Sequence, residues 1–125
     1  MNRDHNIKAL RPFIESIDLI RSVNEIELFQ NEVIRPILKF QSELLVEIFS
    51  KHTRKLNTNY ALLSISEREK HIASLLRKDL ILRNLMIGSI MGLMTSEDIK
   101  IYYDNESELR KRIITMLEAR LLDKI

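Results

Sequence analysis

Arg83 and Asn84 lie side by side in an otherwise apolar stretch, and they are the residues of this chain best suited to chemistry. A guanidinium and a carboxamide together can bind an anion such as a carboxylate or a phosphate. Tyr102 would line the same pocket. These three residues define a predicted small-anion ligand site or enzyme site. In the structural alternative, Arg83 pairs with Glu43 or Glu47, because a buried charge needs a partner.

The sequence gives little support to other kinds of catalytic site or to a metal site. The chain has no cysteine, which excludes disulfides, cysteine-ligated zinc, iron–sulfur clusters and thiol catalysis. Its three histidines, His5, His52 and His71, are far apart and form no HExxH motif. We expect no metal and no cofactor, and the sequence favours a non-enzymatic protein.

Nucleic-acid binding through surface charge is a further alternative. The chain has 20 basic and 18 acidic side chains, which gives a net charge of only +2. Its basic runs, 51–55 and 110–112, are flanked by acids or by expected helix ends. A helix-turn-helix would need a polar recognition helix, whereas the helix expected in that place is apolar.

The element that must position Arg83 and Asn84 is a helix over about 80–94. Apolar side chains fall at nearly every angle around its axis, so the helix must be covered on most sides. At 1.5 Å per residue it reaches only about 22 Å, against roughly 30 Å of membrane hydrocarbon. We therefore expect it at the centre of a bundle, covered by its own chain or by a second subunit.

Two glycines of this helix, Gly88 and Gly92, are four residues apart and lie on one side of it. Glycines at this spacing leave a flat strip that another helix can approach closely. The strip predicts either tight packing inside the chain or the interface of a homodimer.

A long helix is expected over about 23–54, after the capping-box residues Ser22 and Glu25. Pro36 lies inside it and predicts a kink in the preceding turn, because proline has no amide hydrogen to donate. Apolar residues at three- and four-residue steps give this helix one buried face: Ile26, Phe29, Val33, Ile37, Phe40, Leu44 and Ile48.

Further helix starts follow from local signals. Ser66 with Glu69 predicts a helix to about 77, and the sequence leaves open whether that helix runs into the central one. Thr95 opens a short helix, and Asn105 with Glu108 opens the last one.

Residues 1–21 form an N-terminal arm, with a short helix expected after Pro12. The arm packs on the bundle or is exchanged with a second subunit. It has no long apolar core before its charges, so it is not a secretory signal and a cytoplasmic location is expected.

Composition supports one all-α domain over residues 1–125, built as a four- to five-helix bundle. Hydrophobic residues make up 45% of the chain and charged residues 30%, which is typical of a globular protein. Only two glycines and two prolines occur, too few for a β-sandwich with many tight turns.

The whole chain resembles a small family of uncharacterised all-helical bacterial proteins, which are sometimes automatically labelled glyoxalase. The resemblance rests on residues 34–37 (IRPI), on Lys78-Asp79 and on Arg83-Asn84 before the glycine-containing helix. Metal-dependent glyoxalases are built from βαβββ modules with His and Glu ligands, and this sequence has neither the strands nor the ligand spacing.

The leading functional hypothesis is therefore a non-enzymatic interaction or scaffold module that forms a homodimer. Its basis is the surplus of apolar residues, the glycine strip and the lack of a catalytic cluster in the sequence. The anion or enzyme site at Arg83 and Asn84 and charge-based nucleic-acid binding are the two alternatives.

Overall fold

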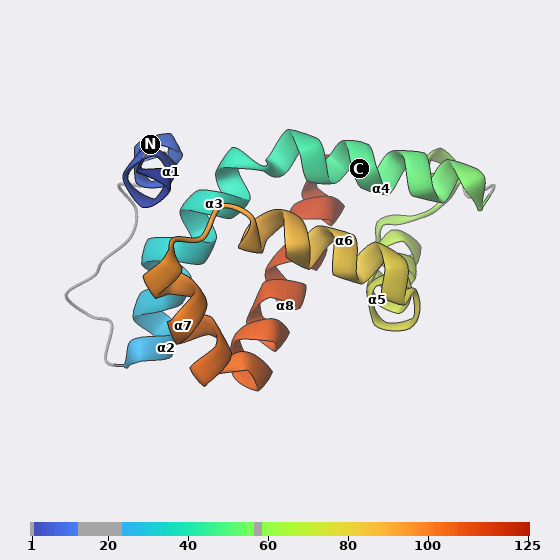
Figure 1. Cartoon of the computed structure of the whole chain (residues 1–125). Helices are drawn as coiled ribbons and strands as arrows, with labels where there is room; N and C mark the ends of the chain where they lie inside the picture. The colour runs from blue at the N-terminus through green and yellow to red at the C-terminus, as the bar shows by residue number, and fades with distance from the viewer. Residues whose placement is uncertain (1, 13–23, 57–58) are drawn as a thin grey trace.

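The computed structural model describes residues 2–12, 24–56 and 59–125. All regular secondary structure in these ranges is helical, which confirms the all-α prediction. Figure 1 shows the helices packed as a bundle in which α6 crosses α8. In chain order the helices are α1 (Arg3–Leu10), α2 (Glu25–Phe29), η2 (Gln30–Ile34), α3 (Arg35–Phe40), α4 (Ser42–Lys55), η3 (Tyr60–Leu62), α5 (Ile65–Lys78), α6 (Leu80–Met91), α7 (Ser96–Asp104) and α8 (Glu106–Lys124).

The expected long helix is interrupted where Pro36 predicts it. The turn before the proline, η2, is a π-helix in which the amide of Arg35 donates to the carbonyl of Gln30. This wider turn relieves the clash between the proline ring and the carbonyl four residues earlier. The change of direction itself follows the proline, at Gln41 between α3 and α4 (Figure 1).

The start of this helix differs from the prediction. Asn24 is the N-cap of α2, and its side chain accepts a hydrogen bond from the amide of Glu27 at 2.8 Å. Ser22, which the sequence suggested for this role, lies outside the described residues.

Helix α5 begins with a capping box formed by Ser64 and Glu67, two residues before the predicted pair, Ser66 and Glu69. Both pairs have the same spacing, so the pattern alone could not separate them. Helices α5 and α6 are separate because Asp79 is extended, with φ −89° and ψ 95°, and caps the end of one and the start of the other.

The two C-terminal helices begin close to the predicted positions. Thr95 and Asp98 form a capping box at the start of α7. Asn105 precedes α8 but makes no capping bond, contrary to the prediction with Glu108; its side chain donates instead to the carbonyl of Ile101 at 3.0 Å.

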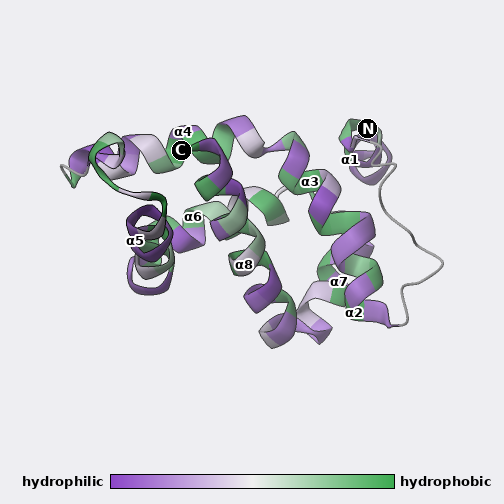
Figure 2. Ribbon diagram, turned by 180° about the vertical axis from the view of Figure 1, so that it is seen from behind, coloured by the Kyte–Doolittle hydropathy of each residue, from purple (hydrophilic) through white to green (hydrophobic). Residues whose placement is uncertain are grey.

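Helix α8 is the element on which the bundle packs. It contacts α4, α5, α6, α7 and η2, and it buries Leu109, Ile113, Leu117 and Leu121 along one side. Figure 2 shows hydrophobic and hydrophilic segments alternating along α4 and α8, as expected for amphipathic helices.

Helix α6 is covered on one side only, against the expectation that most of its sides would be enclosed. Leu82, Met86 and Ile90 are buried in the core, whereas Ile81 is 72% exposed and Leu85 is 52% exposed. The exposed side points away from α8, since α6 lies in front of α8 in Figure 1 and behind it in Figure 2.

The described part of the N-terminal arm docks on the turn between α6 and α7. Arg3 donates to the carbonyls of Met94 and Gly92, each at 2.9 Å, and Arg11 pairs with Asp98 at 2.5 Å. Helix α1 precedes Pro12, whereas the short helix predicted after Pro12 falls on residues outside the described ranges. In the part of the chain that is described, no helix is long and apolar enough to cross a membrane.

Candidate functional site

Arg83 lies in the first turn of α6, and its guanidinium is turned back toward α5. Its Nη1 donates to the backbone carbonyl of Arg77 at 3.1 Å, in the last turn of α5. The predicted ion pair with Glu43 or Glu47 is not found; Glu47 instead lies 3.5 Å from Lys51. A helix-terminal carbonyl needs a donor, and Arg83 supplies one across the break at Asp79.

Asn84 and Tyr102 come together around a residue that the sequence analysis passed over as a site, Arg110. The carboxamide oxygen of Asn84 accepts a hydrogen bond from Arg110 at 3.1 Å, and the charge of Arg110 also acts on the hydroxyl of Tyr102. Burial raises the pKa of Tyr102, while the charge of Arg110 opposes that rise. Tyr102 is only 2% exposed, so its ring is a core side chain and offers no face to a ligand.

The three predicted ligand residues therefore divide into two structural groups. Arg83 closes the α5–α6 corner, while Asn84 and Tyr102 join α6 to α7 and α8 through Arg110. One signal in the sequence could have identified Arg110: it is a cation near the start of the last helix, which was expected to pack against the helix that carries Arg83 and Asn84.

The glycine strip lies on the surface of the molecule. Both Gly88 and Gly92 are exposed, and a Cβ atom built on Gly88 would meet nothing within 4 Å. Tight packing inside the chain, one of the two readings of this strip, is therefore wrong. The other reading, a homodimer interface, stays a prediction.

Exposed apolar side chains surround the strip and continue onto α4. The amide group of Gln41 donates to the carbonyl of Ser89 at 2.9 Å, which holds the start of α4 beside the end of α6. Phe40 and Leu44, on either side of Gln41, are about half exposed. We call this surface the α4–α6 face, and it consists of Phe40, Leu44, Ile81, Leu85, Gly88 and Gly92.

Two histidine contacts lie elsewhere. His52 donates to Asp79 at 2.5 Å, and the hydroxyl of Tyr60 meets Nδ1 of His71 at 2.5 Å. The amide of Leu82 and then His52 lower the pKa of Asp79, so the carboxylate stays charged at the start of α6. Burial raises the pKa of Tyr60 to about 12. Both contacts fix corners between helices.

A metal centre is not seen among the described residues, where no three His, Cys, Asp or Glu side chains gather in a suitable group. No protein-family model matches the chain, and no curated protein or solved structure is significantly similar to it. The resemblance to a bacterial helical family therefore stays a prediction.

Proposed function

We propose that the protein is a non-enzymatic interaction module that forms a homodimer through the α4–α6 face. The observation that carries the proposal is the outer side of α6. Over residues 80–92 the only ionisable side chain is Arg83, which is turned toward α5, while Ile81 and Leu85 stand in solvent. A contiguous apolar patch on a chain with 30% charged residues is typical of an interaction surface.

A second copy of the chain is the occupant that fits this face best. A two-fold axis sets the residues close to it near their own counterparts, which is unfavourable for charged residues and acceptable for uncharged ones. The strip of Gly88 and Gly92 would meet the same strip of the other copy, so the two α6 backbones could approach closely. At the edge of the face, Glu47 and Lys51 offer both signs of charge for symmetric pairs.

The same geometry gives less support to the two alternative functions. An anion or enzyme site at Arg83 and Asn84 is less well supported, since both side chains already have partners within the chain. Nucleic-acid binding by surface charge finds no support on the α4–α6 face. A cytoplasmic location fits a soluble dimer and belongs to this proposal.

The test compares Leu85→Glu with Leu62→Glu in the full chain. Leu62 is 80% exposed and lies on η3, outside the α4–α6 face, so it controls for the loss of an exposed leucine. Sedimentation at several concentrations should give a dimer for the wild type and for Leu62→Glu, and a monomer for Leu85→Glu, because glutamates would face each other across the axis.

Two results would contradict the proposal. One is a wild-type protein that sediments as a monomer at every concentration. The other is a dimer that Leu85→Glu leaves intact, which would place the interface elsewhere.

A further inference from the structure

A groove lined by α3, α4 and α8 gathers basic side chains, and it shares Phe40 with the α4–α6 face. Lys39 on α3 and Arg120 and Lys124 on α8 line a cavity of about 830 Å³. A second cavity of about 500 Å³ shares Arg120 and adds Arg35 from α3 and the acidic Asp123 from α8. On each helix the two basic residues are one turn apart, at positions 35 and 39 and at positions 120 and 124, so two pairs of cations line the groove.

These four cations have no partners of their own. Among the described residues, the side chains of Arg35, Lys39, Arg120 and Lys124 make no hydrogen bond and no ion pair, although Arg120 is half-buried. Four positive charges held close together repel one another. A bound anion would remove this repulsion.

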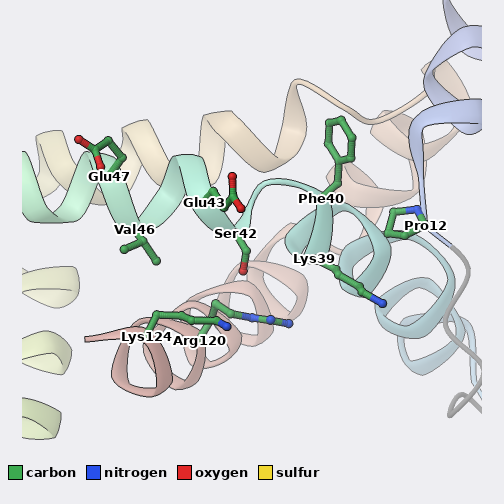
Figure 3. Close-up of a pocket in the computed structure, with 9 residues that line it drawn as sticks. All are labelled: Pro12, Lys39, Phe40, Ser42, Glu43, Val46, Glu47, Arg120 and Lys124. Carbon is green, nitrogen blue, oxygen red and sulfur yellow. The ribbon is translucent and has the colours of Figure 1, made fainter.

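An orphaned hydroxyl points into the same groove. The Oγ atom of Ser42 is buried and has no hydrogen-bond partner, which is unusual for a polar group shielded from water. In Figure 3 this oxygen points toward Arg120 and Lys124. The carboxylates of Glu43 and Glu47 line the cavity as well but point to its opposite side, away from the cations.

We infer that this groove binds a phosphate dianion, with Arg120 and Ser42 at its centre and Lys39, Lys124 and Arg35 around them. A guanidinium matches two phosphate oxygens at once, and lysines add charge without fixed geometry. Val46 and Phe40 line the same cavity and offer apolar contact to the rest of a small phosphomonoester.

The experiment is calorimetric titration of the full chain with inorganic phosphate and with glycerol phosphate, at fixed ionic strength. Arg120→Gln should weaken binding roughly tenfold or more, because it removes a charge-assisted bidentate contact. Ser42→Ala deletes one oxygen and should weaken binding by a few fold. Arg54→Gln is the matched control: it removes the same charge from an exposed position at the end of α4 and should leave the affinity unchanged.

A second experiment distinguishes binding of a free phosphate ester from binding of a lipid headgroup. Vesicles containing phosphatidic acid are sedimented with the protein, and inorganic phosphate is added as a competitor. Release by phosphate supports the groove as the shared site, whichever source supplies the ligand.

The inference is overturned if millimolar phosphate gives no binding signal, or if Arg54→Gln weakens binding as much as Arg120→Gln does. It is also overturned if duplex DNA or RNA binds with a steep salt dependence while free phosphate does not, since that describes a diffuse electrostatic surface. Circular dichroism of each variant keeps a folding defect from being read as a loss of binding, and Ser42→Ala provides an independent result if Arg120→Gln does not fold.

Discussion

Single residues at the helix corners show how burial and hydrogen bonding work together. Tyr60 lies in the connector between α4 and α5. Its ring packs on Phe49, with 5.7 Å between the ring centroids, and its hydroxyl contacts His71 on α5. Its hydroxyl is partly buried, so ionisation in the folded state would leave a charge that water solvates poorly. Because the pKa is raised to about 12 in the folded state, the free energy of unfolding depends on pH in this range.

We predict that Tyr60→Phe lowers the free energy of unfolding by about 1 kcal/mol at neutral pH, because the bond to His71 is lost. The folded pKa is raised above the ordinary 10.0, so Tyr60 adds stability below pH 10 that is lost as the pH rises toward 12. The deficit of the variant should therefore shrink over this interval. Urea denaturation at stepped pH measures both effects, and a deficit that stays constant from pH 10 to 12 would contradict the prediction.

For single residues, the residue type predicted some features of the candidate site and not others. The sequence identified Arg83 as a charge that needs a partner, and that much follows from desolvation alone. It could not identify the partner, because the candidates Glu43 and Glu47 were chosen by charge while the actual acceptor is a backbone carbonyl. Every residue carries such a carbonyl, so composition cannot single one out.

At the scale of whole elements, local signals located helix ends better than helix directions. The helix start at Thr95 is confirmed, and the turn before Pro36, where a kink was predicted, is a π-helix; both depend on residues within one turn. The bend at Gln41 had no such signal. It depends on a hydrogen bond from Gln41 to Ser89, 48 residues away, and the sequence does not encode that contact locally.

Helix α1 offers a test at this scale, because few contacts hold it. Arg11 pairs with the nearly buried Asp98 and also donates to the carbonyl of Leu93 at 2.9 Å. We predict that Arg11→Gln detaches α1 and costs about 3 kcal/mol, as is usual when one partner of a buried ion pair is removed. Hydrogen exchange should become fast at the amides of α1 and stay slow in α8.

Lys8→Gln is the control for this change. It removes one positive charge from an exposed position at the end of the same helix, so the protection of α1 should be retained. Equal loss of protection in both variants would show that net charge, and not the ion pair, holds α1 in place.

At the scale of the whole molecule, a substitution in the glycine strip should affect the stability of the isolated chain and the formation of the homodimer in opposite directions. Gly88 has open space where a side chain would lie, and glycine within a helix is less favourable than other residues by roughly 0.8–1 kcal/mol. We predict that Gly88→Leu makes the isolated chain more stable by up to about 1 kcal/mol and abolishes the homodimer, because the added side chain keeps the two strips apart.

Gly88→Ala is the matched variant, because it also replaces glycine with a better helix former but adds only a methyl group. Both variants are compared by thermal unfolding at low concentration and by sedimentation at high concentration. A destabilised Gly88→Leu monomer, or a Gly88→Leu dimer as strong as that of the wild type, would contradict the proposed interface.

The prediction that α6 would be covered on most sides was wrong because the cover depends on how the whole molecule packs. An apolar helix predicts burial, but hydrophobicity does not say which chain supplies the cover. Leu82 and Met86 are covered by the protein's own core, whereas Ile81 and Leu85 are not. The sequence therefore predicted the class of fold and the apolar surplus, while the side on which that surplus is exposed required the packed structure.

The docking of α1 also has a consequence for biosynthesis. Arg3 binds carbonyls that lie 89 and 91 residues further along the chain. A ribosome adds roughly 5–20 residues per second, so α1 waits roughly 5–18 s for these partners to be made. Until then Ile7 has no core to enter, and α1 stays available to chaperones and proteases.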